Sequence, residues 1–180
     1  MTTTHDTLKK PASKLDWPKQ VTRFLSTSEF PAGALDQMDA RIILALSDLR
    51  KKVGEPLYPS PVLGAHVRHS GSSRHSINGG TRLSDATDFF CSWSAAWRYL
   101  DAARRHPEIG GIGIYTDMVF NPRGATPGLG DWAMIHIDGR AGVAEWIGWR
   151  KGQSAPIRYA SLQRDPLEYH RLLAERGVMR

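Results

Sequence analysis

Cysteine is nearly absent from this chain, because its 180 residues include only Cys91. An intramolecular disulfide is therefore excluded, and so is a zinc site built from several thiolates. Long apolar runs are also absent, and no stretch approaches the length of a transmembrane helix. The polar residues 1–17 do not contain the apolar segment of a signal peptide, so we expect synthesis in the cytoplasm without a signal peptide.

A strong excess of one charge is missing as well. The 24 Lys and Arg residues against 18 Asp and Glu residues give a formal net charge of +6. Such a charge favours polyanions in general, but the basic residues are scattered and form no arginine-rich tract or nucleic-acid-binding motif. We therefore predict no nucleic-acid partner and no membrane span, and we expect a monomer.

The composition that remains is that of a globular protein. Hydrophobic residues make up 41% of the chain, and its length suits one domain that folds without disulfides. We predict a polar leader over 1–21, a main domain over 22–155 and a basic helical segment over 156–180.

Local patterns predict mixed secondary structure. Apolar residues recur at helical spacing from Ile42 to Val53, and Gly54 with the following Glu-Pro ends that helix. A second helix follows Ser92 or Ser94, and a third begins at Asp165-Pro166. The mixed order predicts an α+β fold with a small, mainly antiparallel sheet and flanking helices. Strands are expected at 88–91, 111–115, 132–138 and 143–149.

Three short segments contain the residue types that bind metals: Ser73-Arg74-His75, Ala86-Thr87-Asp88 and His136-Ile137-Asp138. Zinc takes neutral imidazole and carboxylate ligands, and catalytic zinc sites use three protein ligands and one water. Two His and one Asp would supply such a set. The combination alone is not specific, because a chain with seven His residues contains such triples by chance.

The order and flanks of these segments resemble the metallo D-alanyl-D-alanine carboxypeptidase family. This family also contains phage L-alanyl-D-glutamate endopeptidases, and it shares its fold with the hedgehog signalling domain. Its pattern of Ser-x-His, Ala-x-Asp and a late His-x-Asp fits all three segments. The resemblance implies a hedgehog-like fold and a Zn²⁺ ion held by His75, Asp88 and His136.

Further segments extend the resemblance to roughly residues 22–150. Phe24 and Ser28-Glu29-Phe30 are similar to the motif that opens the family's domain. The stretch Gly110-Gly111-Ile112-Gly113-Ile114-Tyr115 is similar to its glycine-rich strand, and Trp146 to the aromatic residue that closes this unit.

The spacing between the first two ligands departs from the family. The chain from His75 to Asp88 is longer than in most members, and we interpret the extra residues as a loop insertion. The insertion leaves Asp85 as an alternative to Asp88. The two carboxylates fall on opposite faces of an extended segment, so only one of them can reach the metal.

The general base is the second departure. Many members carry a Glu where this chain has Ala133, so another carboxylate must take the proton of the metal-bound water. Asp138 is the first candidate, because it lies two residues after His136 and on the same side of a strand. Asp131 and Asp117 are the alternatives.

Substrate contacts are also implied by the resemblance. Arg68 resembles the arginine with which family members hold a substrate carboxylate, and it is predicted to act in both catalysis and substrate binding. Arg74 and Tyr115 are predicted to bind substrate, and Arg82 is an alternative arginine.

The implied function is a zinc metallopeptidase (a hydrolase) that cuts peptidoglycan stem peptides. It would act as a D,D-carboxypeptidase or an L-alanyl-D-glutamate endopeptidase, and would be encoded by a phage or prophage. Such a protein acts in cell wall degradation, either as an endolysin after release or as a virion component. The alternatives are a non-catalytic zinc-binding module and a virion structural protein of the same fold.

Overall fold

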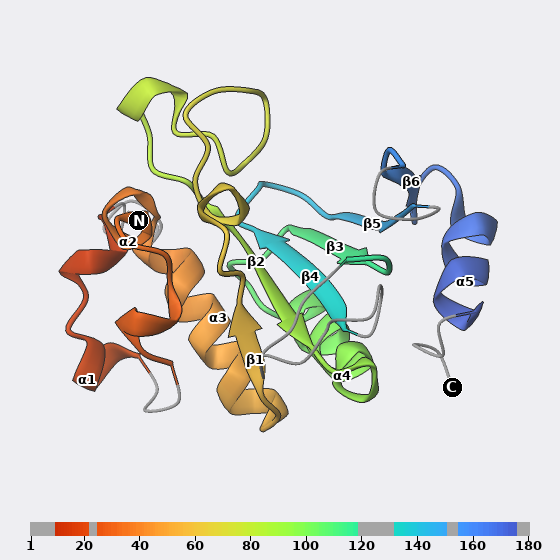
Figure 1. Ribbon diagram of the computed structural model, residues 1–180. Coiled ribbons are helices and arrows are strands. Elements are labelled where there is room, and N and C mark those ends of the chain that lie inside the picture. The colour runs from red at the N-terminus through yellow and green to blue at the C-terminus, as the bar shows by residue number, and fades with distance from the viewer. Residues whose placement is uncertain (1–9, 22–24, 119–131, 151–154, 176–180) are drawn as a thin grey trace, which may run out of the picture.

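The structure is a computed structural model that describes residues 10–21, 25–118, 132–150 and 155–175 (Figure 1). Within these residues the fold is α+β, as predicted, and is built on one mixed sheet of six strands. The strand order is β1-β2-β4-β3-β5-β6, and every pairing is antiparallel except that of β3 with β5. The strands are β1 (Leu57–Pro59), β2 (Ala86–Cys91), β3 (Gly111–Tyr115), β4 (Ala133–Asp138), β5 (Ala144–Trp149) and β6 (Arg158–Ser161).

Two long helices pack behind the centre of the sheet. The helix α3 (Ala40–Val53) packs on α4 (Trp93–Arg104), which contacts β3 and β4. The predicted end of α3 is confirmed, because Gly54 ends the helix with a φ of 73°. At the start of α3 the Asp39 carboxylate accepts a hydrogen bond from the Arg41 amide. The remaining helices are α1 (Trp17–Gln20), α2 (Ala34–Gln37) and α5 (Pro166–Glu175), and none of the described helices is both long and apolar enough to cross a membrane.

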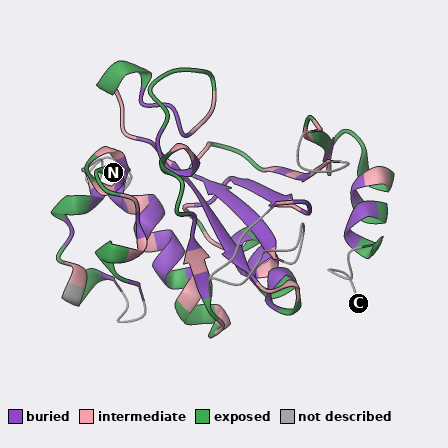
Figure 2. Ribbon diagram, viewed as in Figure 1, coloured by how far each residue is buried: buried purple, intermediate pink, exposed green. Residues whose placement is uncertain are grey.

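The strands β2 and β4 are buried along their whole length (Figure 2). Their two faces differ in chemistry because successive side chains alternate between them. One face is apolar: Phe89 and Ile135 belong to the core, and the Phe89 ring meets that of Tyr99 from α4. The opposite face, the polar face, carries Asp88 of β2 and His136 of β4, in register with Gly113 of β3 and Trp146 of β5.

Glycines in β3 make room for large side chains that lie across this polar face. A Cβ atom at Gly113 would lie 2.5 Å from the Trp146 indole, and one at Gly111 would lie 2.3 Å from the Asp138 carboxylate. Both distances are shorter than a carbon atom can tolerate. The glycine-rich strand therefore lets Trp146 and Asp138 pack close to the sheet backbone.

The substitution Gly113→Ala tests this packing. Because the added methyl group would displace the Trp146 indole, we expect the free energy of unfolding to fall by about 1–3 kcal/mol, as in other overpacked sites. Chemical denaturation measures the change. Gly64→Ala is the matched control, since a Cβ atom there meets nothing within 4 Å. Equal stabilities of the two variants would contradict the proposed close packing.

The predicted boundaries after residues 21 and 155 do not correspond to breaks in packing. Ala12 and Leu15, in the predicted leader, belong to the same hydrophobic core as the sheet. Beyond residue 155 the chain forms β6, which pairs with β5, where only helix was predicted. Tyr169 of α5 is fully buried and belongs to the same core. Both predicted end segments are thus, where described, integral to one domain.

Candidate metal centre

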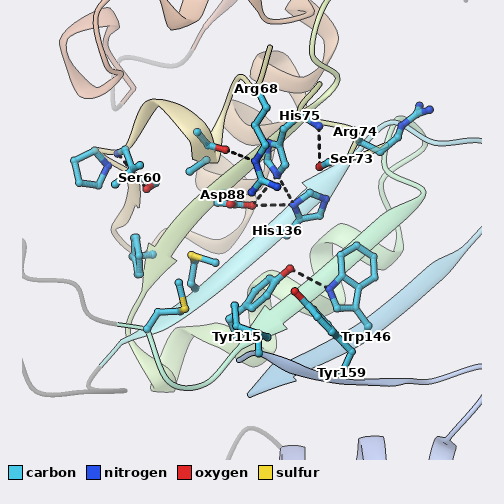
Figure 3. A pocket seen from close by; sticks show the side chains of 18 of the residues that line it. Ser60, Arg68, Ser73, Arg74, His75, Asp88, Tyr115, His136, Trp146 and Tyr159 are labelled. Atoms are coloured by element: carbon cyan, nitrogen blue, oxygen red, sulfur yellow. Dashed lines mark hydrogen bonds and ion pairs between the residues drawn. The ribbon is translucent and has the colours of Figure 1, made fainter. Parts of the chain in front are cut away.

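His75, Asp88 and His136 converge on one point of the polar sheet face (Figure 3). Asp88 of β2 and His136 of β4 are direct register partners, and His75 reaches them from the loop before β2. Asp88 Oδ1 lies 2.8 Å from His136 Nδ1 and 3.4 Å from His75 Nε2. The two imidazole nitrogens, His75 Nε2 and His136 Nδ1, are 3.1 Å apart.

This triangle of donor atoms fits a metal ion. Zinc bonds of about 2.0–2.1 Å in a tetrahedral arrangement place neighbouring ligand atoms about 3.3 Å apart. The three side chains are at most 8% exposed, so no bulk water surrounds the donors. His75 Nδ1 is buried and has no hydrogen-bond partner among the described residues. The other ring nitrogen, Nε2, faces Asp88 and His136.

The choice between Asp88 and Asp85 follows from the loop that carries His75. Asp88 belongs to the buried group of potential ligands. The Asp85 carboxylate instead pairs with Arg74 and, at 3.0 Å, with Arg82, both of which belong to the loop. Asp85 therefore holds the ligand-bearing loop in place and does not face the cluster.

Asp138 lies behind His136 and is fully buried. Its Oδ2 atom is 2.9 Å from His136 Nε2, and its Oδ1 accepts a 2.7 Å hydrogen bond from Arg140 Nε. A carboxylate on the outer nitrogen of a metal-binding histidine fixes the tautomer and the ring orientation. The indole of Trp146 packs beside His136, with ring centroids 5.2 Å apart, and the Arg140 guanidinium lies 5.1 Å from the indole centroid.

The electrostatics of the cluster favour a cation. Burial works to lower the pKa of His136, but hydrogen bonds and charges from Asp138 and Asp88 outweigh it and raise that pKa to about 9. Burial works to raise the pKa of Asp88, yet His136 and His75 bring it well below its usual range. Two ionised carboxylates thus flank His136, and a bound metal ion would replace the proton they attract.

A cavity of about 900 Å³ opens over the cluster, and the three predicted substrate-binding residues, Arg68, Arg74 and Tyr115, line it. In Figure 3 Arg68 extends over Asp88, and its Nε atom donates to the Gly64 carbonyl at 2.9 Å. Arg74 also lines the cavity, but its guanidinium is paired with Asp85. The Tyr115 hydroxyl accepts a 3.3 Å hydrogen bond from the Trp146 indole.

Neither of the two described candidates for the general base, Asp138 and Asp117, lines the cavity. Asp138 is not among its lining residues, and both of its oxygen atoms are already hydrogen-bonded. Asp117 is buried, with its carboxylate bonded to the Thr116 hydroxyl and the Arg150 amide. Asp131 and Phe24 lie outside the described residues.

Two features of the site were not predicted from the sequence. One is Arg140, which binds the Asp138 carboxylate. An arginine two residues after an aspartate at the end of a strand could have indicated this pair. The other is the apolar part of the cavity wall, which includes Phe90 and Met134. These two residues have the same parity as Asp88 and His136 in the predicted strands, so strand alternation could have indicated them.

Comparison of the chain with family models, curated proteins and solved structures found no match in any of the three. The motif-based resemblance to the carboxypeptidase family therefore stays a prediction.

Proposed function

We propose that this protein is a zinc-dependent peptidase that hydrolyses stem peptides of bacterial peptidoglycan, with a fold of the hedgehog and D-alanyl-D-alanine peptidase type. The observation that carries the proposal is the buried group His75, Asp88 and His136 at the base of a large cavity. The order of its members along the chain matches the ligand order of that family. An origin in a phage or prophage, with action at the cell wall after release or from a virion, belongs to the same proposal.

The chemistry that zinc supplies in such a site is polarisation of a scissile carbonyl and a lowered pKa of its bound water. The chain's own residues would prepare the substrate for that step. Arg68 has its Nε atom anchored on the Gly64 carbonyl, which directs the terminal nitrogens of the guanidinium toward the cavity. We assign it the binding of a substrate carbonyl or carboxylate oxygen, a task that suits a planar multidentate donor.

We assign Asp138 a positioning role in place of the predicted role as general base. A base must lie within hydrogen-bond reach of the proton that it abstracts. The Asp138 carboxylate contacts the outer nitrogen of His136 and lies behind that ring, away from the cavity. It would keep His136 Nε2 protonated, so that Nδ1 offers its lone pair to the metal. Asp131 stays the sequence-based prediction for the base.

Digestion of purified peptidoglycan tests the proposal. We expect the zinc-loaded protein to release new amino and carboxyl termini from stem peptides, detected by mass spectrometry. A chelator should stop the release and added zinc should restore it, because the ligands lie within the cavity. His170→Ala, a change at an exposed residue of α5, should digest as the parent does. Zinc-loaded protein that leaves every stem peptide intact would rule the peptidase out.

One observation favours a second function, zinc-dependent binding without hydrolysis. Among the described residues that line the cavity, the sole carboxylate is that of Asp88, which is itself a proposed metal ligand. A non-catalytic module would bind stem peptides in a zinc-dependent way and leave them uncut. The same digestion distinguishes the two functions when binding to peptidoglycan is measured beside it.

A further inference from the structure

Two aromatic side chains cross between β3 and β5 over glycines. Tyr115 of β3 is the register partner of Gly148 on β5, and a Cβ atom at Gly148 would lie 2.6 Å from the Tyr115 ring. Trp146 of β5 is the register partner of Gly113 on β3, and a Cβ atom at Gly113 would lie 2.5 Å from the indole Nε1 atom. The two glycines thus let each ring lie across the neighbouring strand, close to the sheet backbone.

This crossing brings the Tyr115 hydroxyl beside the metal ligands. Gly113, over which the indole Nε1 lies, is the register partner of His136 on the adjacent strand. The indole N–H donates to the Tyr115 hydroxyl at 3.3 Å, and the same indole packs beside the His136 ring. Because neighbouring strands are only about 4.7–4.9 Å apart, the hydroxyl lies next to the ligand cluster. Tyr115 also lines the cavity (Figure 3).

The contacts of the Tyr115 hydroxyl leave a proton available to a ligand. The Trp146 indole can only donate, so the Tyr115 oxygen is the acceptor in that bond. The Tyr159 hydroxyl is its other neighbour, and the two tyrosine rings meet edge-on with centroids 6.2 Å apart. Each phenol carries one proton, and only one proton can lie between the two oxygens. The pair therefore keeps one O–H for the cavity, which both tyrosines line.

Burial keeps Tyr115 in its protonated form. Burial raises the pKa of Tyr115 above its usual value and outweighs the opposing hydrogen bond from Trp146, and the negative charge of Asp88 adds to the rise. At neutral pH the side chain is thus an uncharged hydrogen-bond donor.

We propose that Tyr115 is a catalytic residue whose hydroxyl donates a hydrogen bond to the oxygen of the scissile carbonyl while negative charge develops there. This inference rests on the proposed function and adds a residue to its chemistry. As the attacking water oxygen bonds to the carbonyl carbon, the water gives a proton to the general base, and the electron pair of the C=O bond moves onto the carbonyl oxygen. The phenol keeps its own proton throughout. A donor already held in place by Trp146 stabilises the developing charge without rearrangement.

Phosphinate dipeptides test this donor independently of hydrolysis, because their tetrahedral, negatively charged phosphinate group resembles the carbonyl carbon after attack. Analogues of D-alanyl-D-alanine and of L-alanyl-D-glutamate cover the two bonds of the proposed function, and the tighter binder is used. Titration calorimetry would compare the zinc-loaded parent protein with Tyr115→Phe. We expect the variant to bind the phosphinate about tenfold to a hundredfold more weakly, the usual loss for a hydrogen bond to a charged group.

Hydrolysis and metal content are measured on the same samples. In Tyr115→Phe, kcat for stem peptides should fall by about a hundredfold or more with KM little changed, because the donor acts mainly on the charged transition state. The zinc content should equal that of the parent, which also shows that the variant is folded. Tyr58→Phe is the matched control: it removes a hydroxyl from β1, and Tyr58 is not among the described residues that line the cavity. It should keep both the affinity and kcat.

Parent-like phosphinate affinity in Tyr115→Phe would overturn the proposed donor. A parent protein that binds neither analogue would do the same, as would a loss of affinity found only in Tyr159→Phe. A loss that depends on Tyr115, in a zinc-loaded protein that cuts no stem peptide, would uphold Tyr115 as the donor to a tetrahedral anion and refute the peptidase.

Discussion

Zinc binding is expected to be lost in His136→Ala and in His75→Ala. Each change removes one of three buried donors that face one another within 3.4 Å. We expect zinc affinity to fall by more than about a hundredfold. Loss of a residue that only hydrogen-bonds to a metal ligand already lowers affinity by up to about that factor, and here a ligand itself is lost. Stem-peptide hydrolysis should fall to background with it. Metal analysis after gel filtration measures the zinc content of each variant.

Thermal unfolding gives an independent measure of the same loss. Zinc at a hundred times its dissociation constant should stabilise the parent protein by about 2.7 kcal/mol, because only the folded state presents all three ligands together. The two variants should show no such gain. His170→Ala changes an exposed histidine of α5 and should keep both the metal and the zinc-dependent stabilisation. Full zinc retention in both ligand variants would refute this metal centre.

Asp138→Asn should weaken zinc binding about tenfold to a hundredfold, because the side-chain amide no longer holds a proton on His136 Nε2. At saturating zinc, however, kcat for stem peptides should return to near the parent value. A positioning residue acts through metal affinity, whereas loss of a general base lowers kcat by about 10²–10⁴ whatever the zinc concentration. The split between affinity and kcat therefore separates the two roles.

A matched control exists elsewhere in the chain. Asp39 is also a buried carboxylate paired with an arginine two residues later, Arg41, but it caps α3 and forms no hydrogen bond or ion pair with any of the described histidines. Asp39→Asn should lower stability and leave zinc affinity unchanged. If Asp138→Asn keeps the parent's zinc affinity and loses kcat at saturating zinc, then Asp138 is the general base and the positioning role is wrong.

Local signals in the sequence predicted the elements that depend on neighbouring residues. The helix α3 contains the apolar residues whose helical spacing predicted it and ends at Gly54 as predicted, because both signals act within one or two helical turns. The strands β2 to β5 were predicted from short apolar or alternating runs. The strand β6 was missed, because Arg158–Ser161 contains no apolar alternation and extends through its pairing with β5.

By itself the sequence determined which residues can bind a metal and the face on which each lies. The alternation of side chains places Asp138 on the same side as His136, and it separates Asp88 from Asp85. Only the tertiary structure decided the task of each carboxylate. The register of β4 with β3 places Asp138 beside Gly111 and behind the His136 ring. Asp85 pairs instead with Arg74 and Arg82 of the loop and does not face the cluster. Such roles depend on contacts between distant segments, and no local pattern encodes the distances between them.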